Sequence, residues 1–300
     1  MDRDPRALLP PLAAWPQGAN ATRERVSGVD LHTHTTASDG TLAPDALVEE
    51  AVRRGVRVLA VTDHDSTEAV EPARAAARVH PILEIVPGIE INTEGPGGEI
   101  HVLGYFVDHQ AAWLRDLLQE FREERAARIH RIVERLSALG YAIEADEVFA
   151  LVQEGSAGRP HVARVLVTRG HVGTVREAFD RFLAAGKPAY VSHRKVTPRG
   201  ACELIHRAGG QAALAHPGFL DDAERAIREL AATGHLDGVE CYYAEHSPEE
   251  TARFLGLCRE LGLVATGGSD FHGPPVRAAR LGYPPVPWEA WEALRRRAGR

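Results

Sequence analysis

Ligand-type side chains stand two residues apart near both ends of the chain. His32 and His34 end an apolar run near the N-terminus, and Asp270 and His272 follow a similar run near the C-terminus. Side chains at positions i and i+2 of a strand point to the same face, so each pair can direct two ligands at one ion. Imidazoles mixed with carboxylates suit Zn, Mn or Fe better than a calcium site built only from oxygen atoms. One such pair alone is weak evidence, because a histidine at a strand end is more often structural.

Residues of the same chemical types lie at or near the ends of the other predicted strands. His64 lies in the segment TDHDS, Glu90 in PGIE and His101 in EIH. His216 lies in AHP, and Asp39 stands in the turn after the first histidine pair. In parallel α/β folds the carboxyl ends of the strands form one face, where the loops build the site. Because several strand ends supply ligand-type residues to this face, the sequence predicts a metal centre.

Between these positions, short apolar strands alternate with helices. We expect strands at residues 26–34, 56–62, 82–91, 100–107, 211–215, 238–242 and 263–266. We expect helices at residues 44–54, 66–79, 198–208, 221–232 and 248–261. Alternating β and α units imply a mostly parallel sheet, either open or closed into a barrel.

A helical segment interrupts this alternation between residues 111 and 185. Apolar residues recur there at helical spacing with charges between them. This pattern predicts helices at residues 113–139, 145–153, 160–169 and 174–184. We therefore expect residues 26–108 and 189–300 to form one domain and residues 109–188 to form a helical insertion. Residues 1–25 mix charges with prolines and are expected to form a flexible N-terminal extension.

Composition narrows the classes of function. Hydrophobic residues make up 44% of the chain, charged residues 26%, and the net charge is −7. The acidic balance argues against broad affinity for the nucleic-acid backbone. No apolar run approaches the roughly 20 residues that span a bilayer, and the N-terminus lacks the pattern of a signal peptide. Three cysteines without CxxC spacing indicate a reducing compartment. We expect a cytoplasmic protein with no membrane partner and no stable protein partner.

Taken together, the motifs closely resemble the polymerase-and-histidinol-phosphatase (PHP) superfamily. The matching segments are DLHTHTTASDG at 30–40, TDHDS at 62–66, PGIEIN at 87–92, EIHVLGYFVD at 99–108, LAHPG at 214–218 and GGSDFHG at 267–273. The resemblance implies an α/β fold, a distorted (β/α)7 barrel with a trinuclear metal centre at the strand ends. It implies divalent ions, for which we expect Mn²⁺, although the same ligands accept Zn²⁺ or Fe²⁺.

When the ligand positions of the family are matched to this sequence by motif, every position holds a residue that can bind a metal. One ion would take His32, His34, Glu90 and Asp270. A second would take Asp39, His64 and His272, and a third Glu90, His101 and His216, with Glu90 bridging. The reaction implied is phosphoester hydrolysis, in which a metal-bound water of lowered pKa attacks phosphorus.

Two segments of the helical insertion resemble one branch of the superfamily. GRPHVAR at 158–164 and FLAAGKPAYV at 182–191 look like the branch that hydrolyses nucleoside 3′,5′-bisphosphates and trims short RNA from the 5′ end. By this resemblance Arg159 and Arg164 would bind phosphate, with Lys187 assisting. His161 could orient a leaving group or phosphate, stack on a base, or cap its helix. In catalysis, either His161 or a metal-bound water could protonate the leaving group. The expected partner is a small nucleotide or the 5′ end of a short RNA.

Three other functions stay open. The first is another phosphomonoesterase of the same superfamily, such as one acting on histidinol phosphate. The second is hydrolysis of C–N bonds, which mixed histidine and carboxylate centres in barrels also perform, although no lysine follows a strand as a bridging ligand. The third is a non-catalytic metal-binding accessory module, because related domains occur attached to DNA polymerases. The intact ligand set argues against this third function.

Overall fold

The computed structural model describes residues 28–95, 98–152, 157–192, 196–274 and 279–300. Its centre is a sheet of seven strands whose spatial order follows the sequence. The strands are β1 (Val29–Asp30), β2 (Val58–Val61), β3 (Glu84–Gly95), β4 (Gly98–Tyr105), β5 (Gln211–Leu214), β6 (Gly238–Tyr243) and β7 (Val264–Gly268). The N-terminal extension and the first two residues of the strand expected at 26–34 lie outside the described residues.

The sheet curves so that its first and last strands meet. Leu31 N donates to Gly267 O at 3.1 Å, and His34 N donates to Phe271 O at 2.9 Å. These bonds join the segments that follow β1 and β7, so the sheet is nearly closed. The expected distorted barrel is therefore confirmed.

Most neighbouring strands run parallel, as the alternating pattern predicts. The exception is β4, which pairs antiparallel with both β3 and β5. β3 and β4 form a hairpin joined at Gly95 and Gly98, and a connection this short allows only antiparallel pairing. The hairpin carries two candidate ligands, Glu90 and His101, on neighbouring strands.

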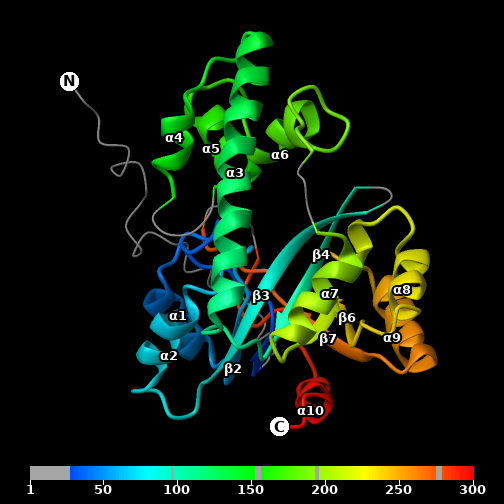
Figure 1. Cartoon of the computed structure of the whole chain (residues 1–300). Helices are drawn as coiled ribbons and strands as arrows, with labels where there is room; N and C mark the ends of the chain where they lie inside the picture. The colour runs from blue at the N-terminus through cyan, green and yellow to red at the C-terminus, as the bar shows by residue number, and fades with distance from the viewer. Residues whose placement is uncertain (1–27, 96–97, 153–156, 193–195, 275–278) are drawn as a thin grey trace.

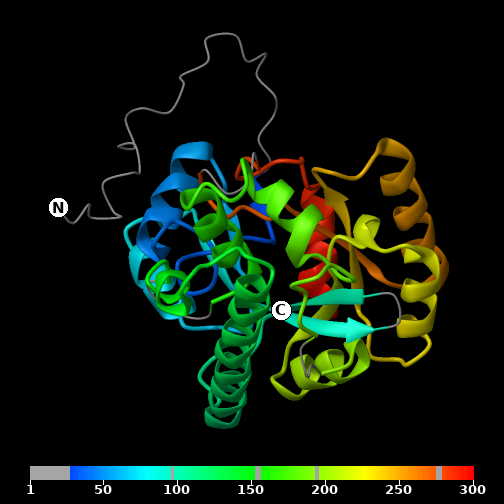
Figure 2. The same ribbon diagram turned by 90° about the horizontal axis from the view of Figure 1, so that it is seen from above.

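Helices cover the outside of the barrel (Figures 1 and 2). They are α1 (Pro44–Arg54), α2 (Val70–Ala77), α7 (Pro198–Arg207), α8 (Ala223–Ala231), α9 (Pro248–Leu261) and α10 (Trp288–Arg297). α9 begins after Ser247, whose side chain accepts from Glu250 N, and ends at Gly262 with a φ of 68°. Both are standard helix boundary signals. α10 has no counterpart among the predicted helices. It buries Trp291 against Phe106 at the base of the barrel.

The predicted helical insertion forms a second hydrophobic cluster. Its elements are α3 (Ala112–Ala138), α4 (Ala145–Phe149), α5 (Arg159–Thr168), α6 (Val175–Ala178) and a π-helical turn (Phe179–Leu183). Leu114 and Leu118 of α3 pack in the barrel core, whereas Ile132 and Leu136 pack in the second cluster. α3 therefore links the two, and Figure 1 shows it extending beyond the sheet. The domain boundaries at 109 and 188 stay a prediction.

Among the residues that the structure describes, no helix is both long enough and apolar enough to cross a membrane.

Candidate metal centre

All nine candidate ligands converge at the end of the barrel where the parallel strands finish. They come from segments that are far apart in the chain, and most of their side chains are buried. The segment after β1 supplies His32, His34 and Asp39, and the segment after β7 supplies Asp270 and His272. The loops after β2 and β5 supply His64 and His216, and the β3–β4 hairpin supplies Glu90 and His101.

Glu90 lies at the middle of this cluster. Ring nitrogens of five histidines approach its carboxylate to between 2.9 and 3.3 Å, namely His32, His34, His64, His101 and His216. Its Oε2 is buried, yet it accepts no well-formed hydrogen bond from any residue that the structure describes. A buried carboxylate oxygen without a well-aligned hydrogen bond is costly. A cation bound between this oxygen and the neighbouring imidazoles would satisfy it.

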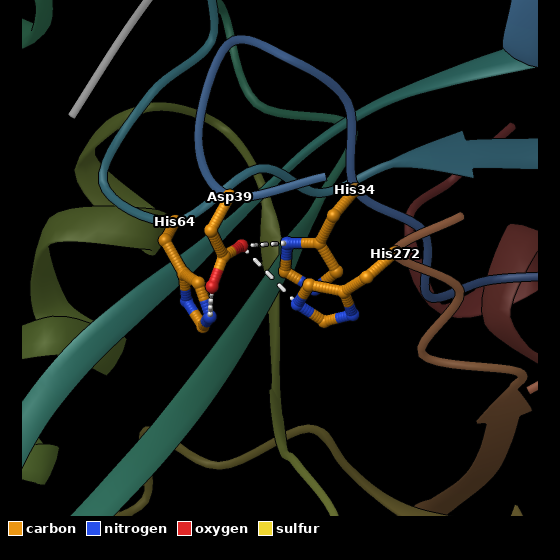
Figure 3. A group of neighbouring side chains, drawn as sticks. All are labelled: His34, Asp39, His64 and His272. Atoms are coloured by element: carbon orange, nitrogen blue, oxygen red, sulfur yellow. Dashed lines mark ion pairs between the residues drawn. The ribbon is translucent and has the colours of Figure 1, made fainter. Parts of the chain in front are cut away.

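A second group surrounds Asp39 (Figure 3). Its Oδ1 lies 3.1 Å from His272 Nε2 and 3.8 Å from His34 Nδ1. Its Oδ2 lies 3.9 Å from His64 Nε2. One ligand atom from each of these four residues lies within 4.8 Å of the others. Three imidazoles and one carboxylate around a common point are a donor set typical of Zn, Mn or Fe.

Two further groups complete the centre. Asp270 Oδ1 lies 3.4 Å from His32 Nε2 and 3.2 Å from His34 Nε2. The remaining group contains His64, Glu90 and His101. The three groups contain residues of the three predicted ligand sets, but the grouping differs. His34 and His64 each belong to two groups, whereas each belongs to one predicted set. The chemistry of the donors and their spacing fit several divalent ions.

One buried carboxylate that sequence reasoning missed orients the cluster. Glu240 Oε1 accepts from His32 Nδ1 at 3.0 Å, and its Oε2 accepts from His216 N at 2.7 Å. Such contacts fix the ring orientation and the reactive tautomer of a metal-binding histidine. The available signal was an acidic residue inside the apolar strand 238–242. Glu240 is fully buried there.

Opposite charges dominate the electrostatics of the cluster. Burial lowers the pKa of His32, but the carboxylates of Glu240, Asp270 and Glu90 outweigh burial and hold it well above its usual value. Burial likewise lowers the pKa of His34, but the nearby carboxylates of Asp270 and Glu90 outweigh burial and raise it to about 9. Burial raises the pKa of Glu90, but the surrounding imidazoles hold it well below its usual range. A cation that binds here would therefore displace protons from these imidazoles.

The centre opens into a cavity of about 180 Å³. Its walls include the candidate ligands His64, Glu90, His101, His216, Asp270 and His272, together with Glu99, Ala215, Phe219 and Leu220. The cavity therefore gives a small anionic molecule direct access to the ligand-type side chains.

Comparison with known proteins agrees with this geometry. A family model for the PHP domain matches residues 30–154. The 5′-3′ exoribonuclease Rnm of Salmonella typhimurium is 38% identical over 88% of this chain and 93% of its own length. This chain belongs to the PHP domain family. The 3′,5′-nucleoside bisphosphate phosphatase of Chromobacterium violaceum is 34% identical over 91% of this chain and 98% of its own length.

A solved structure from Bifidobacterium adolescentis has the same fold. That protein is thought to be a metal-dependent phosphoesterase. It is 30% identical, has a TM-score of 0.82, and covers 90% of this chain and 96% of its own. Because these relatives are similar over most of the chain, this PHP protein is a metal-dependent phosphoesterase.

The structure brings two of the three predicted substrate-binding residues to the PHP centre. Arg159 donates to Glu99, which lines the cavity, and to Leu183 O at 3.1 Å. Arg164 donates to the backbone O of Asp39 at 2.8 Å. The Nε of Arg164 is buried and makes no hydrogen bond with the described part of the chain. Lys187 is exposed in the turn after the π-helix and does not line the cavity.

His161 occupies the first turn of α5 and is buried. Its Nδ1 accepts from Gly158 N at 3.1 Å, which is a helix-capping contact. Burial, and then the nearby Arg164, lower the pKa of His161 to about 3. The imidazole is therefore neutral near pH 7. This geometry favours helix capping over a role as a general acid.

Arg128 of α3 is a second residue that sequence reasoning missed. It is buried, donates from Nε to Val191 O at 2.8 Å, and lies 3.4 Å from Glu99 Oε1. Arg159 pairs with the other oxygen of Glu99. The available signal was an arginine on the apolar face of a predicted helix, but helical spacing cannot show what the arginine faces.

Proposed function

We propose that this phosphoesterase hydrolyses the 3′-phosphate of nucleoside 3′,5′-bisphosphates, for example adenosine 3′,5′-bisphosphate to AMP. We propose that it also removes nucleotides from the 5′ end of short RNA by the same chemistry. The observation that carries the chemistry is the buried Glu90 carboxylate, whose Oε2 lacks a well-formed hydrogen bond although imidazoles surround it. The named activities of the Salmonella and Chromobacterium relatives support the substrate class.

We propose that the cluster holds three divalent ions, with Mn²⁺ as the first candidate and Zn²⁺ or Fe²⁺ as alternatives. His32, His34, Glu90 and Asp270 would hold one ion. Asp39, His64 and His272 would hold the second, and Glu90, His101 and His216 the third. When bound, such ions activate water for attack and offset the negative charge of the phosphoryl group.

The residues of the helical segment would select the substrate. In our proposal Arg159 exchanges Glu99 for a substrate phosphate, which a planar guanidinium can bind through two hydrogen bonds. Arg164 would orient the phosphate from beside Asp39, where its Nε is buried without a well-formed partner among the described residues. Lys187 would assist only if its exposed side chain turns toward the cavity. His161 Nε2 would offer a neutral hydrogen-bond donor, since Nδ1 accepts from Gly158 N.

A substrate panel tests this proposal. Phosphate release with Mn²⁺ is measured for adenosine 3′,5′-bisphosphate, 3′-AMP, histidinol phosphate and an aryl phosphate, and AMP release is measured for a 5′-phosphorylated RNA pentamer. We expect the bisphosphate to give the highest kcat/KM, because only it offers a second phosphate to the arginines. Preferred hydrolysis of histidinol phosphate would keep the metal chemistry and reject the proposed substrate.

A further inference from the structure

An aromatic side chain at the edge of the metal cavity is exposed to solvent. Phe219 lines this cavity together with His216 and Glu90, and 53% of its surface is exposed. Exposing a large apolar ring to water costs free energy that burial would recover. An exposed ring beside a polar, metal-binding cluster is therefore suited to a ligand with both an apolar face and charged groups.

The turn that carries this ring is held from two sides. Phe219 ends the 3₁₀ turn η4 (Pro217–Phe219). Glu240 accepts from His216 N at 2.7 Å, and His246 Nε2 accepts from Gly218 N at 3.1 Å. A Cβ on Gly218 would lie 2.6 Å from His246 Cδ2, so the backbone and this imidazole are in close contact. The ring is thus presented by a fixed backbone, and a ligand need not order a loop in order to use it.

Neighbouring rings support one edge of Phe219. Its centroid lies 5.6 Å from that of Tyr243 with the ring planes at 83°, and 5.3 Å from that of His216. Edge-to-face packing of this kind fixes the plane of a ring. The remaining surface is open to the cavity mouth and to solvent.

We propose that Phe219 is the platform on which the base of the substrate stacks while its phosphate lies at the metal centre. This inference rests on the proposed function and adds the residue that recognises the base. His216 contacts both Phe219 and the central Glu90, so the ribose would span the short path from base to phosphate. Every nucleobase has a π-face, so stacking favours nucleotides over other phosphoesters without selecting one base.

The test compares two substrates that differ only in the base. One is adenosine 3′,5′-bisphosphate and the other is 1-deoxyribose 3,5-bisphosphate, which has no base. For Phe219→Ala we expect kcat/KM on the nucleotide to fall about tenfold or more, from the usual strength of base–aromatic stacking. On the abasic substrate we expect a far smaller change. Phe219→Trp should keep the preference for the nucleotide.

The control is Trp288→Ala, which removes a partly exposed aromatic at the start of α10, packed on Arg57. It should leave both kcat/KM values near those of the wild type. An equal fall on both substrates in Phe219→Ala, or no fall on either, would overturn the inference. The inference would also be overturned if Phe219→Ala changed the oligomeric state on size exclusion but kept the preference for the substrate that carries a base.

Failure of the proposed function would look different. In that case the wild type would release phosphate from neither bisphosphate, and binding would decide the inference instead. The fluorescence of 2-aminopurine riboside 3′,5′-bisphosphate in Ca²⁺ should be quenched by the wild type and by Trp288→Ala but not by Phe219→Ala. Equal quenching by all three proteins would reject Phe219 as the platform.

Discussion

Two buried carboxylates, those of Glu90 and Glu240, orient the ligand-type histidines. Glu90 faces five imidazoles, while Glu240 supports two of the histidines from behind. The two glutamates differ in role, since Glu90 lies among the candidate ligand atoms and Glu240 accepts from a ring nitrogen and a backbone amide. Each role makes a separate prediction.

Replacing the central carboxylate should remove bound metal. In Glu90→Gln the amide keeps the size of the side chain but loses the negative charge that balances the imidazoles. We expect metal content, measured by inductively coupled plasma mass spectrometry after purification with Mn²⁺, to fall by at least one ion per chain. Glu84→Gln is the matched control, because Glu84 is exposed at the first position of the same strand. Full occupancy in Glu90→Gln would contradict a bridging role.

Replacing the supporting carboxylate should weaken metal binding without abolishing it. Glu240→Gln leaves the ligand atoms in place but alters the partner of His32 Nδ1. We expect affinity for Mn²⁺, measured by competition with a chelating indicator, to fall about 10- to 100-fold, as is usual for such orienting groups. Glu245→Gln, an exposed residue just beyond β6, should bind Mn²⁺ like the wild type. If both variants match the wild type, Glu240 does not position the ligand.

At the scale of elements, strand ends bring the ligands together only because the backbones approach closely. A Cβ added to Gly268 at the end of β7 would lie 2.4 Å from His32 N. Gly268→Ala should therefore push apart the segments carrying His32 and Asp270, lowering both Tm and metal affinity. Gly256→Ala is the control, because nothing lies within 4 Å of its added Cβ inside α9.

Thermal unfolding monitored by circular dichroism checks this contrast. We expect Gly256→Ala to stabilise the protein by about 0.5–1 kcal/mol, since glycine is unfavourable inside a helix. Gly268→Ala should instead destabilise it by about 1–3 kcal/mol, the usual cost of overpacking. A wild-type Tm for Gly268→Ala would mean that β7 can shift freely, which contradicts a fixed ligand geometry.

α5 belongs to the same scale, because it carries Arg159 beside the cavity. Arg159→Ala should lower kcat/KM for adenosine 3′,5′-bisphosphate about 10- to 100-fold, since hydrogen bonds to charged groups contribute about 1.5–3 kcal/mol. The loss should be smaller for 3′-AMP, which lacks the second phosphate. Arg169→Ala, at the exposed end of α5, is the matched control. Equal losses on both substrates would reject Arg159 as a second-phosphate contact.

Sequence reasoning succeeded where local signals are complete. The bounds of α1 and α9 agree with the prediction, because glycines end both helices in the left-handed region. The helix expected at 66–79 is shorter, since α2 covers only Val70–Ala77. The motifs also identified all nine side chains that converge at the strand ends. Glu240 and Arg128 were missed because their partners, His32 and Glu99, are distant in sequence and follow no local pattern.

At the scale of the whole molecule, α3 joins a hydrophobic cluster of the barrel to the hydrophobic cluster of the helical segment. The barrel carries the ligand-type residues, and the helical segment brings Arg128, Arg159 and Arg164 over them. α3 packs in both clusters, so it fixes the arginines relative to the barrel. In our proposal the barrel holds the metal ions and the base-stacking Phe219, and the helical segment supplies the arginines that bind phosphate. Variants of these arginines should therefore leave metal content unchanged.

The most direct test of the account is phosphate release from adenosine 3′,5′-bisphosphate by metal-stripped protein as Mn²⁺ is added back. We predict no release without metal, restoration by Mn²⁺ in the wild type, and almost none at any Mn²⁺ concentration in His34→Ala, whose ring contacts two of the three ligand groups. Circular dichroism confirms that each protein is folded. Phosphate release that survives both metal removal and His34→Ala would contradict the claim that this cluster is the catalytic metal centre.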